Sequence, residues 1–364
     1  MTKSETDRPA VEPSRGSPRP ASPQAWLVDD LRFDAHALGG PQRPGYHPER
    51  PERLVAARAA VAAAAVDWQR VASREATAEE LGRVHGAGYV AALERLRGAT
   101  TSLDPDTYVA PGSVAAARLA AGSTVAMVDQ LLDSDVRLGL ALLRPPGHHA
   151  RPDMAMGFCL LNSVAVAAAH ARARGLGRVL VVDWDVHHGN GTQEMFWASP
   201  DVLYVSLHQY PFYPGTGAAD EVGDGDGRGY TVNVPLGAGV GNDVYRAAFE
   251  RVVLPVAHEY SPDLVLVSAG FDASARDPLA GMKLSPAAFG WMGKALRSVA
   301  DDTAKGRIGL VLEGGYDLVG LEAGLASAIA GFIGNDAADI AATTETPPDV
   351  ADAVSSARRT WKAG

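Results

Sequence analysis

The chain has 364 residues, of which 46% are hydrophobic and 21% are charged, and this composition excludes a disordered, collagen-like or coiled-coil protein. Its 43 acidic residues outnumber its 33 basic residues, and the net charge of −10 argues against nucleic acid as the main partner. The single cysteine, Cys159, excludes an intramolecular disulfide and fits a reducing compartment. The first residues lack the apolar segment of a secretory signal, and the longest apolar run is too short to span a bilayer. We therefore expect a soluble, cytoplasmic protein that has neither nucleic acid nor a membrane as a partner.

Residues 1–24 are rich in proline, serine and charge without periodicity, which predicts a disordered tail ahead of a single domain over 25–364. Short apolar runs with many β-branched residues then alternate with helical patterns, which favours an α/β fold with a parallel sheet between helix layers. The predicted strands span 25–30, 140–146, 178–185, 202–208, 230–236, 264–272 and 308–315. Helix is predicted for most of 51–134 and for 162–174, 242–260 and 285–304, starting at Asn162, Asn242 and Ser285, with a kink at Pro255.

Polar side chains follow the predicted strands at the ends where ligands gather in open α/β sheets. Asp185 and His187 follow one strand, and a spacing of two places both side chains on the same side of an extended chain. Asp272 closes another apolar strand and supplies a third ligand. Two carboxylates and one imidazole with open coordination positions suit a catalytic zinc ion or a similar divalent metal.

Two adjacent histidines, His148 and His149, follow a stiff Arg-Pro-Pro-Gly turn at a further strand end. Beside a metal, two such imidazoles can act as general base and general acid if a partner fixes the tautomer of each. Asp183 and Asn190 flank the metal ligands in the sequence and can supply these partners. Tyr316 follows Glu-Gly-Gly at the end of the last strand, where its hydroxyl can bind the oxygen of a polarised carbonyl.

Together these segments resemble the histone deacetylase superfamily, which also includes acetylpolyamine amidohydrolases and acetoin-utilisation proteins. The resemblance implies the arginase–deacetylase fold, in which one parallel sheet of about eight strands lies between helix layers. It also implies a zinc-dependent amidohydrolase that removes acetyl or other acyl groups from amines by attack of a metal-activated water. The motifs that carry it are YHPERPERL (46–54), RPPGHH (144–149), GFCLLNSVAVAA (157–168), DWDVHHGNGTQ (183–193), PGTG (214–217), NVPL (233–236), AGFDASARDPLAG (269–281) and LEGGYD (312–317).

The resemblance assigns a role to each motif residue. His149 is implied as the base that takes the water proton, and Tyr316 as the residue that shares the oxyanion with the metal. The zinc ligands implied are Asp185, His187 and Asp272, and the catalytic group comprises His148, His149, Tyr316, Asp183 and Asn190. Structural potassium ions are implied near Asp183, Asp185, His187, Ser206 and Leu207, and near Phe196, Ser199, Val202 and Tyr230.

The residues matched to the substrate tunnel and its rim differ in places from the family pattern. Tyr213 stands where phenylalanine is common, which makes that wall more polar. Leu279 stands where a polyamine-selective relative has glutamate, and the absence of a carboxylate favours an acetyl-lysine-type substrate or another acetyl amide over a cationic polyamine. The substrate-binding residues implied by the resemblance are Asp106, Gly157, Phe158, Tyr213, Leu279 and Gly314.

Alternatives to the acetyl-lysine deacetylase differ in metal count, activity or substrate. A dinuclear manganese ureohydrolase would need a further aspartate two residues after Asp272, where this chain has Ser274. A non-catalytic acetyl-amide binding protein would be expected to lack a metal ligand, a catalytic histidine or the tyrosine. Acetylpolyamines, small acetylated metabolites and acetylated peptides or proteins stay open as substrates. The oligomeric state also stays open, including a homo-oligomer whose neighbouring subunit extends the rim.

Overall fold

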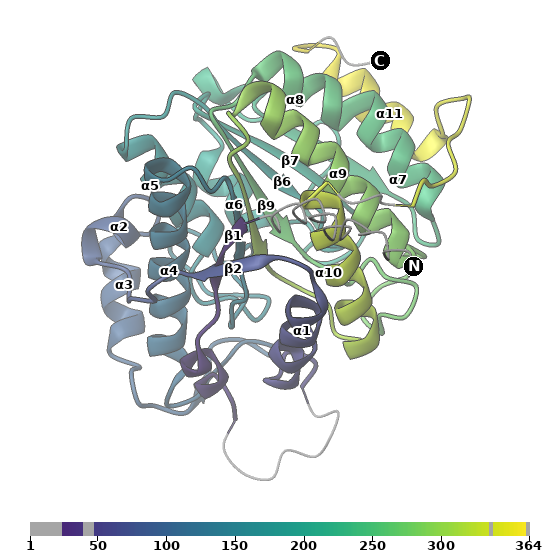
Figure 1. Cartoon of the computed structure of the whole chain (residues 1–364). Coiled ribbons are helices and arrows are strands. Elements are labelled where there is room, and N and C mark those ends of the chain that lie inside the picture. Colours follow the sequence, from purple (N-terminus) through teal and green to yellow (C-terminus); the bar gives the residue numbers. More distant parts are fainter. Residues whose placement is uncertain (1–23, 39–46, 335–337, 362–364) are drawn as a thin grey trace, which may run out of the picture.

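An eight-stranded parallel sheet runs through the centre of the computed structural model, which describes residues 24–38, 47–334 and 338–361 (Figure 1). The strands lie in the order β2-β1-β5-β10-β9-β6-β7-β8, and every neighbouring pair is parallel. Their bounds are β1 Gln24–Val28, β2 Asp67–Arg70, β5 Leu138–Ala141, β6 Val179–Asp183, β7 Val202–Gln209, β8 Thr231–Leu236, β9 Leu264–Ala269 and β10 Ile308–Leu312. Two short antiparallel strands, β3 (Thr101–Ser102) and β4 (Tyr108–Val109), form a separate pair.

Helices cover both faces of the sheet (Figure 1). On one face α4 packs against α5 and against strands β1, β5 and β10, whereas on the other α10 packs against both α1 and α9. The α-helices are α1 Glu52–Ala63, α2 Ala78–Gly82, α3 Ala87–Glu94, α4 Ser113–Asp133, α5 Ser163–Ala173, α6 Asn190–Phe196, α7 Asn242–Ala248, α8 Leu254–Tyr260, α9 Pro286–Thr303, α10 Leu318–Phe332 and α11 Pro348–Ala357. The predicted α/β architecture, a parallel sheet between helix layers in a single domain, is confirmed.

All seven predicted strands are present, and β6, β9 and β10 are buried along their whole length, as an internal parallel sheet requires. The predicted bounds are too long at the carboxyl ends, because β5, β9 and β10 stop where the polar site residues begin. The prediction of helix for most of 51–134 misses β2, a polar edge strand beside β1, and the β3–β4 pair. The disordered tail predicted over 1–24 lies outside the described residues except for Gln24, which begins β1.

Of the two predicted asparagine caps, one is confirmed and one is wrong. Asn162 caps α5, since its side chain accepts a hydrogen bond from Ala165 N at 3.0 Å. The cap predicted at Asn242 is wrong, because Asn242 lies within α7 and its side-chain oxygen accepts from Ser285 N at 3.0 Å instead. The irregularity expected at Pro255 takes the form of a π-helical turn between α7 and α8. Among the described helices, none combines the length and apolarity needed to cross a membrane.

The strand order brings the predicted site segments to one place. In the sheet β5, β10, β9, β6 and β7 are consecutive neighbours, although they are far apart in the sequence. The register pairs Leu312 at the end of β10 with Ala269 at the end of β9, and Asp183 at the end of β6 with Ser268. The loops that follow these strands therefore leave the same edge of the sheet side by side.

Candidate active site

The carboxylates of Asp185 and Asp272 and the imidazole of His187 converge beyond the ends of β6 and β9. One ligand atom from each residue lies within 4.8 Å of the other two, and all three residues are buried. His187 Nδ1 lies 3.2 Å from Asp185 Oδ1 and 3.1 Å from Asp272 Oδ2. The three side chains that the sequence predicts as metal ligands thus form one cluster.

Backbone N–H groups fix the orientation of the two carboxylates. His187 N donates to Asp185 Oδ1 at 2.9 Å, and Val186 N donates to Asp272 Oδ1 at 2.9 Å. Gly314 N donates to Asp185 Oδ2 at 2.8 Å, and a Cβ atom at this glycine would lie 2.2 Å from Asp272 Oδ2. The predicted contact of Gly314 with substrate stays a prediction, and in the structure its N–H group helps to orient the Asp185 carboxylate.

Burial and the close approach of the three side chains shift the pKa of each member of the cluster. Burial opposes a charged imidazole, yet hydrogen bonds to the two carboxylates outweigh burial and raise the pKa of His187 to about 10. Burial and the charge of Asp185 raise the pKa of Asp272 to about 7. Burial also opposes ionisation of Asp185, but the nearby His148 and His187 hold the pKa of Asp185 well below its usual range. Two carboxylates and an imidazole with this charge balance fit a divalent cation such as zinc.

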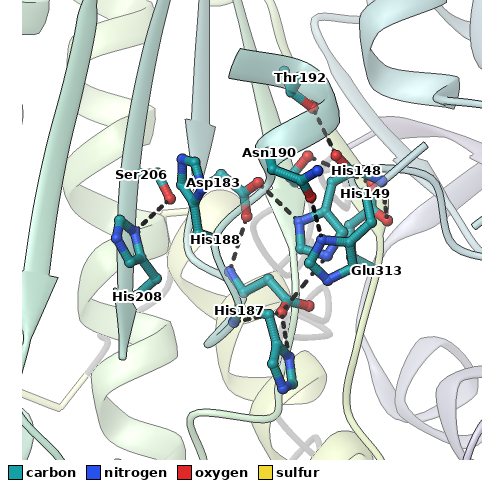
Figure 2. Close-up of polar contacts among 12 residues, drawn as sticks. His148, His149, Asp183, His187, His188, Asn190, Thr192, Ser206, His208 and Glu313 are labelled. Atoms are coloured by element: carbon teal, nitrogen blue, oxygen red, sulfur yellow. Dashed lines mark hydrogen bonds and ion pairs between the residues drawn. The ribbon is translucent and has the colours of Figure 1, made fainter. Parts of the chain in front are cut away.

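His148 and His149 lie side by side with their ring centres 4.0 Å apart, but each has a different partner (Figure 2). His148 Nδ1 lies 3.0 Å from Asp183 Oδ2, whereas His149 Nδ1 donates to the neutral Asn190 Oδ1 at 2.9 Å. Burial opposes charge on His148, but Asp183 and Asp185 outweigh it and raise the pKa of His148 to about 10. Burial and the positive charges of His148 and His187 hold the pKa of His149 well below its ordinary value. The pair therefore contains one charged and one neutral imidazole.

Glu313 supports the histidine pair, although no role is predicted for it from the sequence. Its Oε2 accepts hydrogen bonds from Gly147 N at 2.6 Å and from His148 N at 3.2 Å (Figure 2). Burial raises the pKa of this carboxyl to about 7. Glu313 is the first residue after β10, whereas its partners Gly147 and His148 follow β5. The sequence around Glu313 therefore carries no signal of this contact.

The residues predicted for the tunnel surround a cavity of about 190 Å³ that ends at the site. Phe158, Tyr213, Leu279, Asp106 and Gly157 line it, and His149, His187 and Tyr316 also reach it. Phe212 has no predicted role but also lines the cavity, and its ring stacks on that of His187 with centres 5.5 Å apart. The signal available for it was its place beside Tyr213 in the run Tyr-Pro-Phe-Tyr-Pro.

Tyr316 contributes a protonated hydroxyl at this cavity. Its ring packs edge-on against Phe158, with ring centres 5.7 Å apart, and the Arg53 guanidinium lies 4.9 Å from the ring centre. Burial raises the pKa of Tyr316 well above its ordinary value. The hydroxyl is therefore a hydrogen-bond donor throughout the neutral range.

The predicted potassium sites stay predictions. Ser206 lies beside Asp183 in the β6–β7 register, and its hydroxyl donates to His208 Nδ1 at 2.9 Å (Figure 2). At the second predicted site, Phe196 O accepts a hydrogen bond from Ser199 N at 2.9 Å. The remaining predicted positions are Asp185, His187, Leu207, Val202 and Tyr230.

Buried His85 connects the segment after His149 to the start of α5 through two hydrogen bonds. We expect this histidine to make the folding stability depend on pH. Its Nδ1 donates to Arg151 O, and its Nε2 accepts from Asn162 N at 3.0 Å. Burial lowers its pKa from 6.5 to about 4. Between pH 6.5 and pH 4, His85 is protonated in the unfolded chain but stays neutral in the folded chain. The free energy of unfolding therefore falls as the pH drops through this range. The full effect of this histidine is roughly 3 kcal/mol.

Urea denaturation between pH 7 and pH 5 measures this dependence. The variant His85→Gln is expected to show a smaller loss of unfolding free energy over this range than the wild type. The control His258→Gln changes an exposed histidine on α8 and is expected to leave the dependence as it is. Equal pH dependence in wild type and His85→Gln would contradict the assignment.

Comparisons with known proteins agree with this geometry. The family model described as the histone deacetylase domain matches residues 47–332. Histone deacetylase 15 of Arabidopsis thaliana is 47% identical over 298 residues, which cover 80% of this chain and 53% of that protein. Polyamine deacetylase HDAC10 of Homo sapiens is 42% identical over 327 residues, 85% of this chain and 48% of that protein.

A bacterial relative and a solved structure match over most of their own length. The histone deacetylase-like amidohydrolase of Pseudomonas aeruginosa is 43% identical over 308 residues, 80% of this chain and 81% of that protein. The crystal structure of the HDA15 HD domain superposes with a TM-score of 0.86 at 41% identity, covering 93% of this chain and 95% of that one. The chain thus spans about half the length of the Arabidopsis and human relatives but nearly all of the solved domain.

Proposed function

Because the chain belongs to the histone deacetylase family, we propose that it is a zinc-dependent hydrolase that removes acetyl groups from acetylated amines. One observation carries the proposal: His187 of the buried triad, the neutral imidazole of His149 and the phenol side chain of Tyr316 line the same cavity. Asp185, His187 and Asp272 would hold the metal. The bound metal would supply Lewis-acid chemistry by polarising the substrate carbonyl and acidifying water.

The chain's own residues then divide the proton transfers between them. His149 donates through Nδ1 to Asn190, so its Nε2 keeps a free lone pair and can take a proton from the attacking water. His148 is held in its charged form by Asp183 and stabilises negative charge that develops during the attack. The Tyr316 hydroxyl donates a hydrogen bond to the carbonyl oxygen as it becomes an oxyanion.

The lining of the cavity favours acetyl-lysine-type substrates. Phe158 and Tyr213 offer aromatic walls to a linear alkyl chain, and Asp106 and Leu279 belong to the same lining. Leu279 carries no charge that would attract a cationic polyamine at this position. The named relatives include both histone deacetylases and a polyamine deacetylase, so an acetylpolyamine is the second candidate substrate and a small acetylated metabolite the third.

A comparison of substrates tests this proposal. The purified protein is expected to release acetate from an acetyl-lysine peptide with a higher kcat/KM than from acetylputrescine or acetylspermidine, and dialysis against a chelator is expected to abolish all three activities. Higher kcat/KM on the acetylpolyamines would favour the second candidate. A zinc-loaded protein that hydrolyses no acetyl amide would favour the non-catalytic binding protein.

The compartment and the assembly also belong to the proposal. A lone, buried Cys159 is consistent with a reducing compartment, which favours the cytoplasm. An acetylated peptide, protein or small molecule is the proposed partner, and a homo-oligomer is an option that gel filtration with light scattering would test.

A further inference from the structure

The backbone of the loop that carries Tyr316 is tied to a buried carboxylate from a different loop. Asp277 Oδ2 accepts hydrogen bonds from Tyr316 N at 2.6 Å and from Asp317 N at 3.1 Å. Asp277 Oδ1 accepts from Leu279 N at 3.0 Å. Asp277 is 8% exposed, and these three bonds all go to backbone N–H groups of the two loops that border the cavity.

The loop after β10 requires such anchors because two consecutive glycines precede Tyr316. Glycine has the largest backbone freedom of any residue, and Gly315 adopts a φ of 117°, outside the range of other residues. On the carbonyl side, Arg53 Nε donates to Gly315 O at 2.7 Å, and its guanidinium also donates to Glu313 O. On the N–H side, the carboxylate of Asp277, opposite in charge to Arg53, accepts the hydrogen bonds of the loop. The loop is therefore held from both sides by buried charged groups.

We propose that Asp277 is a positioning residue for the deacetylation reaction, which fixes the Tyr316 hydroxyl where it can bind the substrate carbonyl. The inference rests on the function proposed above. Tyr316 touches the reacting carbonyl, whereas Asp277 acts through the backbone of Tyr316. Because a hydrogen bond to an oxyanion depends steeply on position, a loosened loop lowers the rate of the chemical step more than it weakens substrate binding.

Steady-state kinetics on an acetyl-lysine peptide separate this role from general destabilisation. Asp277→Ala is expected to lower kcat by about tenfold or more and to change KM by less than about threefold. Asp277→Asn is expected to lose less, because one amide oxygen can still accept from Tyr316 N and Asp317 N. Asp317→Asn is the matched control, because it removes a negative charge from the residue after Tyr316 but keeps a side chain that can cap α10. This variant is expected to keep kcat within about twofold of wild type.

A double variant gives the readout that a purely structural role would not move. If Asp277 acts through the Tyr316 hydroxyl, Asp277→Ala should lower kcat by less than about threefold in a Tyr316→Phe background. A trifluoroacetyl-lysine peptide provides a second test, because attack on its more electrophilic carbonyl depends less on a hydrogen bond from the Tyr316 hydroxyl. Both single variants are expected to show smaller losses on that substrate, where the residual rates are also easier to measure.

Defined results would overturn the inference. They are a kcat of Asp277→Ala within about threefold of wild type, or an undiminished loss from this change in the Tyr316→Phe background. If Asp277→Ala does not fold, Asp277→Leu carries the same test, because its side chain has a similar size but accepts no hydrogen bond, and an unchanged kcat in that variant overturns the inference. A wild type that is inactive on both peptides and on the acetylpolyamines removes the proposed function itself, whereas an active wild type with an unaffected Asp277 variant removes this inference alone.

Discussion

Replacement of His149 by alanine is expected to lower kcat on an acetyl-lysine peptide by about 10²–10⁴-fold, the range that a positioned general base contributes. His149 is the imidazole of the pair with a depressed pKa, so it is neutral at pH 7 and able to accept a proton. Its Nδ1 is bonded to Asn190, and its ring reaches the cavity. Acetate release at saturating substrate, followed by a coupled assay, measures the effect.

The neighbouring histidine provides the internal comparison. His148 is paired with buried Asp183, so His148→Ala leaves an uncompensated buried carboxylate and is expected to lower the Tm as well as the activity. His149→Ala leaves the neutral Asn190 and is expected to shift the Tm much less. The assignment of the base fails if His149→Ala retains more than about a tenth of the wild-type kcat while His148→Ala does not.

Much of the fold could be predicted because the sequence alternates clearly between strand and helix patterns. Strands β6 and β9 are apolar runs rich in valine with a neighbouring strand on each side, and such runs have a strong signal. The edge strand β2, with the sequence DWQR, has none, because its pairing is decided by the exposed edge of β1 rather than by its own apolar content. Tertiary context thus determines the element that pattern alone misses.

The candidate site likewise contains residues that the sequence indicates and residues that only the fold reveals. The predicted metal ligands and the histidine pair are chemically distinctive side chains at strand ends, so their types and spacing indicate them. Glu313 and Asp277 instead act by accepting hydrogen bonds from backbone N–H groups of other segments. A carboxylate in that role has no characteristic spacing, since its partners are set by the strand order β5-β10-β9 and not by the sequence around it. Asn242 illustrates the reverse case, in which a good capping residue is drawn into a contact with Ser285.

Replacement of Asp272 by asparagine is expected to remove the metal while the fold is kept. The amide oxygen can still accept the hydrogen bond that Val186 N now gives to Oδ1. The amide nitrogen then replaces Oδ2, the oxygen that faces His187 and the other ligand, and an N–H group cannot bind a cation. We expect the metal content after gel filtration to fall from about one ion to less than about a tenth per chain, and deacetylation to fall with it.

Thermal unfolding with and without added zinc gives a readout that does not depend on activity. A ligand that binds the folded state stabilises it by about 2.7 kcal/mol at a hundred times its Kd, so zinc is expected to raise the Tm of the metal-depleted wild type but not that of Asp272→Asn. The control Asp263→Asn changes a carboxylate at the opposite end of β9, where it accepts from Gly177 N and Arg178 N, and it is expected to respond to zinc as the wild type does. An Asp272→Asn protein that retains a stoichiometric ion and the full zinc-induced Tm shift would show that the cation binds elsewhere. The triad would then have to be explained as a buried proton-sharing cluster, and the proposed hydrolase would lose its metal centre.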